Sequence, residues 1–138
     1  MVTKERFARY RQKLNFVVGK VAQIPKTINT YLEKDATFYR MQTAIDACMD
    51  IVAMLVKDEG HDVGDDYTNI HTLQSENILD KKLADDVTRL NGLRNALVHK
   101  YNSFEEEAVT ENIGSIKRIL VKFMEAVEDE LKTFNRKN

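Results

Sequence analysis

Residues that cross-link or turn a chain are scarce in this sequence of 138 residues. It contains one cysteine, one proline and five glycines. Few glycines and prolines favour long uninterrupted helices over many short strands joined by turns. The single thiol, Cys48, excludes a disulfide within the chain and favours a reducing compartment. Because Cys48 falls on an apolar stripe, we expect it to be a buried and inert thiol.

Long apolar segments are also missing. No stretch approaches the roughly 18 consecutive apolar residues of a transmembrane helix, and the longest apolar stretch lies around residues 51–56. Residues 1–6 contain no apolar region of a secretory signal. These absences predict a cytoplasmic protein without a membrane segment.

The common signatures of cofactor and metal binding are absent as well. The sequence has no G-x-x-x-x-G-K-[ST], no G-x-G-x-x-G, no H-E-x-x-H and no paired C-x-x-C. His61 and His71 flank a loop with Asp62, Asp65 and Asp66, a set that could in principle bind a metal. Its spacing matches no established site, and an exposed polar loop explains it better. We therefore expect no cofactor and no metal.

What the sequence does contain is a helical repeat of apolar residues. In the first run, apolar and aromatic residues recur at alternating steps of three and four, which a strand cannot produce. Pro25 lies within this run, so we expect a kink there. The run consists of Phe7, Tyr10, Leu14, Val17, Val21, Ile24, Ile28 and Tyr31.

The same spacing predicts three more long helices and one short helix. Residues 34–57 form the most apolar helix, and Asp66 can cap a short one that follows. Asp80 can cap the next helix, and Ser103 can cap a last helix with acidic residues in its first turn. The stripe of the last helix is Val109, Ile113, Ile116, Leu120, Phe123, Val127, Leu131 and Phe134.

Composition and charge fit one globular domain. Hydrophobic residues make up 43% of the chain and charged residues 31%, which argues against disorder. The net charge is −1, with a basic stretch at residues 1–20 and an acidic one at residues 58–66. A solvated face is the simplest interpretation of such charge runs. We predict a single all-α domain over residues 1–138, an up-down bundle of four long helices and one short helix.

One polar segment, residues 94–101, lies at the end of the fourth predicted helix, whose apolar positions Leu90, Leu93 and Leu97 anchor it inward. It reads Arg-Asn-Ala-Leu-Val-His-Lys-Tyr. Asn95 and His99 are four residues apart and share a helix face. Arg94 and His99 are five apart, about 140° around an ideal helix, so one chain aligns them poorly. A groove shared between two copies would bring the two residue types together more easily.

Arginine and histidine together suit the cleavage of RNA without a metal. A histidine, with an ordinary pKa near ~6.5, can take the proton of a 2′-hydroxyl or give one to the leaving oxygen. An arginine is always charged and can hold the phosphate in the transition state. A second interpretation stays open, because basic residues at a helix C-terminus also suit the helix dipole.

The segment resembles a family motif. Residues 94–101 match the R-x4-H-x-Y signature, with an asparagine after the arginine, of HepT-like toxins in the HEPN superfamily. The resemblance extends to the leading helix, to Phe38-Tyr39-Arg40 at the start of the second helix, to the acidic glycine-containing loop and to the acidic start of the last helix. It therefore covers most of the chain.

The resemblance implies a fold, an activity and a partner. It implies a HEPN-like helical bundle that forms a homodimer, with the two motifs facing a shared cleft. It also implies a metal-independent RNA endonuclease, the toxin of a type VII-like toxin–antitoxin pair, neutralised by a minimal nucleotidyltransferase antitoxin of the MntA type. By this resemblance Arg94 and His99 are catalytic, Asn95 is a supporting polar residue, and Tyr101 accepts AMP from the antitoxin.

Two alternatives belong to other classes of function. The first is a non-catalytic module that binds a nucleotide or docks a nucleotidyltransferase through the same segment. The second is a purely structural helical dimer, which the heptad spacing of the first helix favours. For Tyr101 the alternative is an aromatic side chain packed on the last helix.

Overall fold

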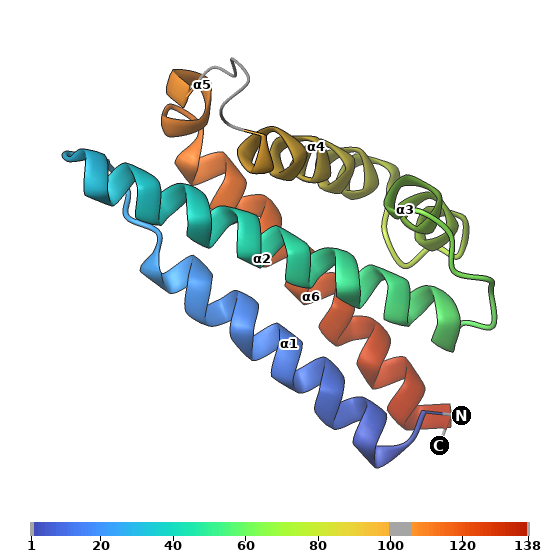
Figure 1. Ribbon diagram of the computed structural model, residues 1–138. Helices are drawn as coiled ribbons and strands as arrows, with labels where there is room; N and C mark the ends of the chain where they lie inside the picture. The colour runs from blue at the N-terminus through green and yellow to red at the C-terminus, as the bar shows by residue number, and fades with distance from the viewer. Residues whose placement is uncertain (1, 100–105, 138) are drawn as a thin grey trace.

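The computed structural model describes residues 2–99 and 106–137, and the regular structure in this part of the chain is entirely α-helical. Six helices follow one another within these ranges (Figure 1): α1 (Lys4–Gln23), α2 (Tyr31–Asp58), α3 (Asp66–Ser75), α4 (Lys81–Val98), α5 (Glu106–Thr110) and α6 (Ile113–Lys137). The predicted all-α class and its four long helices are confirmed. The prediction of one short helix was incomplete, because α3 and α5 are both short.

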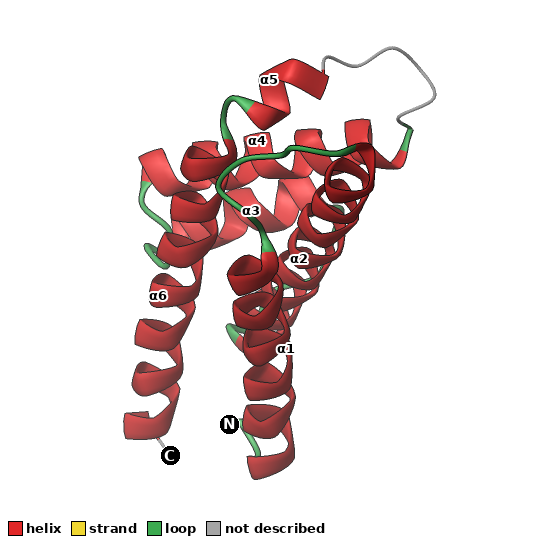
Figure 2. Ribbon diagram, turned by 90° about the vertical axis from the view of Figure 1, so that its left-hand side faces the viewer, coloured by secondary structure: helices red, strands yellow, loops and turns green. Residues whose placement is uncertain are grey.

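The four long helices form a ring in which neighbours run in opposite directions (Figures 1 and 2). α2 packs against α1 on one side and against α4 on the other. α6 closes the ring by packing against α1 and α4. α3 packs against α2 and α4. This arrangement is the predicted up-down bundle.

The apolar stripes predicted from the sequence form the interior of the bundle. On α1, Tyr10, Leu14 and Val17 are buried. The apolar residues that recur at helical spacing on α2 are buried as well, namely Phe38, Met41, Ile45, Cys48, Val52 and Leu55. Burial of each large apolar side chain stabilises the fold by roughly 1.5–3 kcal/mol, so these stripes hold the helices against one another. The buried positions of α5 and α6 are Val109, Ile113, Ile116, Leu120, Phe123, Val127, Leu131 and Phe134.

The predicted continuation of the first helix through Pro25 was wrong. α1 ends at Gln23, and Ile24 is extended, with ψ 116°. A proline disfavours helical backbone at the preceding residue and cannot donate a backbone hydrogen bond, so the helix ends instead of bending. Nη1 of Arg40 donates to the exposed carbonyl of Gln23 at 2.6 Å. Tyr31, the last member of the predicted stripe, is 82% exposed and begins α2.

Side-chain caps determine where the next helices begin. Thr30 accepts a hydrogen bond from the Glu33 N–H at 3.0 Å, so α2 starts three residues before the predicted position. The cap of α3 is Asp65 and not Asp66, because the Asp65 carboxylate accepts from the Thr68 N–H at 2.8 Å. These bonds satisfy amide groups that have no partner within the helix.

The last predicted helix is divided into α5 and α6 at Asn112. The side chain of Asn112 donates to the carbonyl of Ala108 at 2.6 Å, and its backbone N–H donates to Val109 at 3.0 Å. Its own carbonyl accepts from the Ile116 N–H at 3.0 Å and so starts α6. An asparagine side chain that competes for backbone groups in this way interrupts a helix. Ser103, the predicted cap, lies outside the described residues.

A polar cluster joins the start of α1 to the end of α2. The hydroxyl of Tyr10 donates to Asp58 at 2.5 Å, and Nε of Arg6 donates to the same carboxylate oxygen at 2.9 Å. Tyr10 is fully buried. Burial, followed by the hydrogen bond to Asp58, raises the pKa of Tyr10 above its ordinary value. The hydroxyl therefore stays protonated and donates.

The C-terminal end of α4 lies beside α5 and the N-terminal half of α2 (Figure 1). The start of α1 and the end of α6 lie together at the opposite end of the bundle, in both views (Figures 1 and 2). Within the described ranges, no helix is long and apolar enough to cross a membrane.

Candidate active site

Helix α4 carries most of the polar segment singled out in the sequence. The helix begins after Asp80, whose carboxylate accepts a hydrogen bond from the Leu83 N–H at 2.8 Å, as predicted for a cap. Leu90 and Leu97 are buried and hold one face of α4 against the core. Arg94 and its neighbours on the other face are therefore partly or fully exposed.

Arg94 is tied to α2 by an ion pair. Its Nε donates a hydrogen bond to Oδ1 of Asp46, and its Nη1 donates to Oδ1 of Asn95 at 3.2 Å. The side chains of Arg94 and Asp46 are 34% and 39% exposed. Two acceptors thus orient the guanidinium while solvent still reaches it. A cation held in this way is suited to binding a phosphate group.

His99 ends α4. It is the C-cap residue, with φ −103° and ψ 37°, and its backbone N–H donates to the carbonyl of Asn95 at 3.2 Å. His99 is exposed, and an exposed imidazole can exchange protons with a bound substrate. The structure thus joins Arg94 to Asn95 and places His99 one turn further on. Tyr101 lies outside the described residues.

A groove between α1 and α2 adjoins this site. It has a volume of about 420 Å³ and is lined by Gln12, Lys13, Phe16, Thr43, Asp46, Ala47 and Asp50. Lys13 and Asp50 pair across it, with 3.2 Å between Nζ and Oδ2. Asp46 lines the groove and also binds Arg94, so this carboxylate links the groove to the polar end of α4.

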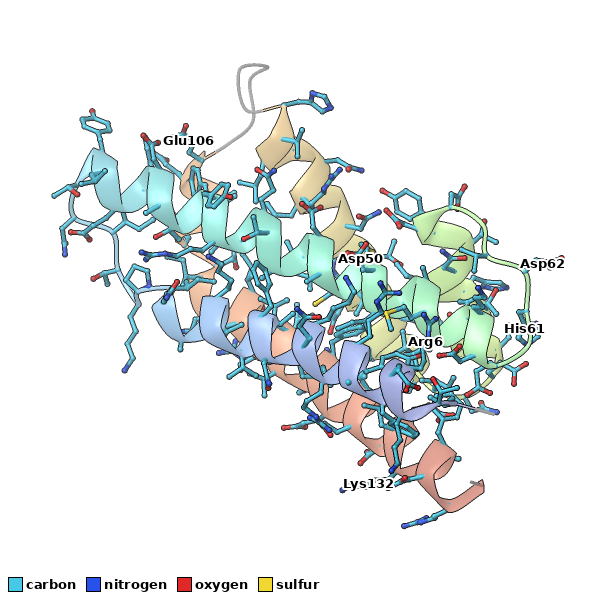
Figure 3. All side chains as sticks on the ribbon, turned by 60° about the horizontal axis from the view of Figure 1, so that its bottom comes forward. Arg6, Asp50, His61, Asp62, Glu106 and Lys132 are labelled. Atoms are coloured by element: carbon cyan, nitrogen blue, oxygen red, sulfur yellow. The ribbon has the colours of Figure 1, made fainter. Side chains whose placement is uncertain are left out.

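The acidic loop is remote from this site. Figure 3 shows His61 and Asp62 in the loop after α2, at the opposite end of the molecule from Glu106 of α5. Nε2 of His61 lies 2.7 Å from Oε1 of Glu76, and His71 is exposed on α3. Among the residues that the structure describes, no group of three or more His, Cys, Asp or Glu side chains is placed to hold a metal ion.

Asp46 is the residue of this site that the sequence interpretation missed. Asp46 and Asp50 are the only charged residues between positions 41 and 56, in the most apolar helix of the chain. An acidic residue inside such a segment needs a partner or a route to solvent. That isolation was an available signal, although nothing in the sequence indicates that the partner is Arg94.

Fold and site together define a class of protein, a small all-α bundle that exposes an arginine, an asparagine and a histidine at the end of one helix. A family model described as "Ribonuclease HepT-like" matches residues 21–127. The chain therefore belongs to the HepT-like ribonuclease family, and the predictions of this family and of ribonuclease activity are confirmed.

Individual relatives agree with this placement. A protein of Archaeoglobus fulgidus named "Putative RNase" is 42% identical over 123 residues, which cover 89% of this chain and 93% of that protein. The solved structure of YutE, a cytosolic protein of unknown function from Bacillus subtilis, has a TM-score of 0.80 at 17% identity and covers 91% of this chain and 90% of its own. A tri-AMPylated HEPN toxin of Shewanella oneidensis, solved in complex with an MNT antitoxin, has a TM-score of 0.78 at 17% identity. This match covers 87% of the present chain and 96% of the toxin chain. The two structural likenesses establish the fold.

Proposed function

We propose that this ribonuclease is a metal-independent RNA endonuclease in which Arg94 and His99 are catalytic and Asn95 supports them. One observation carries the proposal. In a chain of the HepT-like family, an oriented guanidinium and an exposed imidazole share one end of α4. The guanidinium supplies a fixed positive charge, and the imidazole supplies a group that can both accept and donate a proton.

The proposed reaction uses the 2′-hydroxyl of the RNA as its nucleophile. The hydroxyl oxygen attacks the adjacent phosphorus, and the bond from phosphorus to the 5′-oxygen of the next nucleotide breaks. An imidazole takes the hydroxyl proton, and an imidazolium gives a proton to the leaving oxygen. Arg94 stabilises the charge that develops on the phosphate. The products are a 2′,3′-cyclic phosphate and a 5′-hydroxyl.

A homodimer would supply both proton-transfer groups at once. One His99 cannot be base and acid at the same moment, whereas the His99 residues of two copies facing one cleft can take one role each. The angle of about 140° between positions 94 and 99 on an ideal helix also favours a site shared by two copies. Light scattering should give twice the chain mass of 16.0 kDa. A monomer at all concentrations would contradict the shared cleft.

Cleavage of a labelled single-stranded RNA in the presence of EDTA tests the catalytic assignment. Arg94→Ala and His99→Ala should each lower the cleavage rate by at least about 100-fold while circular dichroism stays unchanged. A matched RNA with 2′-deoxyribose at the cleaved position should resist the wild-type protein. Wild-type rates for His99→Ala would overturn the assignment. RNA binding without cleavage by the wild-type protein would favour the non-catalytic module.

We also propose that the protein acts in the cytoplasm as a toxin that a nucleotidyltransferase antitoxin neutralises at Tyr101. The supporting likeness is to the Shewanella toxin, which is described as tri-AMPylated and bound to its antitoxin. In the transfer, the Tyr101 oxygen bonds to the α-phosphorus of ATP. The bond between this phosphorus and the oxygen that bridges it to the β-phosphorus breaks, and pyrophosphate leaves. The AMP group would place bulk and negative charge two residues beyond His99, where it would obstruct RNA.

Co-expression with a nucleotidyltransferase from the neighbouring reading frame tests this regulation. Intact-mass analysis should show AMP-sized increments, and peptide mapping should place the first on Tyr101. Tyr101→Phe should lose that increment and should arrest growth even with the antitoxin present. An unmodified Tyr101 in protein that the antitoxin has silenced would contradict the proposal, and the nuclease assignment would stand independently.

A further inference from the structure

Asp46 is the acidic residue of α2 that contacts the polar end of α4. Its neighbours Ile45, Ala47 and Cys48 are buried, so α2 presents an almost wholly apolar side to the core. Asp46 lies at the edge of that side, where α2 faces both α4 and the groove shared with α1. The position places one carboxylate directly against the Arg94 guanidinium.

The contact uses a particular edge of the guanidinium. Asp46 accepts from Nε, and Asn95 accepts one hydrogen bond from Nη1 at 3.2 Å. Among the residues that the structure describes, Nη2 makes no hydrogen bond. The two bonds use Nε and one N–H of Nη1, and the Arg94 side chain is 34% exposed. The edge formed by Nη1 and Nη2 is the one that grips a phosphate with two parallel bonds.

We propose that Asp46 is a positioning residue for Arg94, an inference that rests on the proposed function. By binding Nε, the carboxylate fixes the torsion angles of a long side chain before the RNA arrives. The phosphate then meets that edge already in place, and the cost of ordering the side chain is avoided. The hydrogen bond from Nη1 to Oδ1 of Asn95 also restricts rotation of the guanidinium plane.

A role in stability alone does not explain this pair. Both side chains are more than a third exposed, and ion pairs at that exposure contribute little to the free energy of unfolding. α4 packs against α2, and Leu90 and Leu97 of α4 are buried in the core. Loss of the Asp46 carboxylate should therefore leave the fold intact and change the behaviour of Arg94.

Asp50 provides a matched control. It lies four residues, about one helical turn, beyond Asp46 on α2 and pairs with Lys13 across the groove at 3.2 Å. Asp50→Asn therefore removes the same charge from the same helix and breaks an ion pair, but it leaves Arg94 untouched. Asp46→Glu keeps the carboxylate and tests whether the charge itself restores the effect.

The test measures kcat and KM for RNA cleavage and the affinity for an uncleavable 2′-deoxy RNA. Asp46→Asn should lower kcat by about 10- to 100-fold and weaken binding of the uncleavable RNA, with thermal unfolding unchanged. Asp46→Glu should recover part of the loss, and Asp50→Asn should stay within about twofold of wild type. In an Arg94→Lys background, Asp46→Asn should have little further effect.

Two results would overturn the inference while the proposed function stands. If wild-type protein cleaves RNA and Asp46→Asn cleaves it equally well, Asp46 does not position Arg94. If Asp46→Asn cleaves faster or binds RNA more tightly, the carboxylate masks the arginine instead. A wild-type protein that neither cleaves nor binds RNA overturns the proposed function itself, and the inference with it.

Discussion

At the scale of single residues, burial determines which reactive groups a reagent can reach. Cys48 is 1% exposed, in the middle of the core stripe of α2. Burial raises the pKa of its thiol above the ordinary value. Because the thiolate is the reactive form, Cys48 is inert in the folded protein, in agreement with its position on the predicted stripe.

This predicts the response of the protein to a thiol reagent. Native protein should react with Ellman's reagent many times more slowly than free cysteine, because the fold must open before the thiol is reached. Unfolded in urea, the chain should release one equivalent of the coloured product, from Cys48. Rapid reaction of the native protein would show that α2 is not packed as described.

The contact between Arg94 and Asp46 shows what a sequence leaves undetermined at this scale. The two residues are 48 positions apart, and neither forms part of an apolar repeat. The pattern of α4 predicted that Arg94 lies away from the buried stripe, but only packing of α4 on α2 selects its partner. The candidate site was therefore predictable as a segment, and its supporting residue was not.

At the scale of elements, short polar side chains determine where helices begin and end. Asp80 accepts the hydrogen bond that starts α4, and Asn112 supplies the bonds that separate α5 from α6. The helix that holds Arg94 therefore depends at its N-terminus on one exposed carboxylate. Such a cap contributes to stability out of proportion to the area it buries.

We expect Asp80→Ala to lower the free energy of unfolding by about 1 kcal/mol, because the Leu83 N–H loses its acceptor. Urea unfolding followed by circular dichroism measures the change. The matched control is Asp85→Ala, which removes an exposed carboxylate from the same helix and breaks its pair with Lys81. The control should change stability by less than about 0.5 kcal/mol. Equal effects would argue against a capping role for Asp80.

Helix interiors were predictable, and helix ends were predicted only in part. The stripe from Val109 to Phe134 is buried as expected, because apolar spacing alone determines which side faces the core. The same spacing continued past Pro25 and Asn112, where the helices break. At Pro25 the proline ring prevents the helix from continuing, and at Asn112 the side chain takes a backbone hydrogen-bond partner. The spacing of apolar residues contains no information about either effect.

At the scale of the whole molecule, an ion pair between Arg11 and Glu128 joins the first and last helices. Arg11 of α1 donates two hydrogen bonds to the carboxylate of Glu128 on α6. The hydrogen bond from Arg11 lowers the pKa of Glu128 below its ordinary value of 4.5. The pair therefore stabilises the folded state above that pH, and its contribution is lost as the pH falls through the lowered pKa of the folded state.

Glu128→Gln should therefore destabilise the protein near neutral pH and much less in acid. The effect near pH 7 should be below about 1 kcal/mol, since both side chains are more than a third exposed and water screens the pair. Thermal melts of both proteins across the acidic range measure how the difference shrinks. Glu125→Gln, an exposed change on the same helix, should show no such trend. A difference that grows in acid would contradict this account.

The arrangement of the chain ends has a practical consequence for work with the protein. α1 begins and α6 ends at the side of the bundle farthest from the C-terminal end of α4 (Figures 1 and 2). An affinity tag or a tether at either terminus would therefore leave the surface around Arg94 and Asn95 unobstructed. Protein anchored to a sensor chip in this way would present that surface to nucleic acid flowing above it.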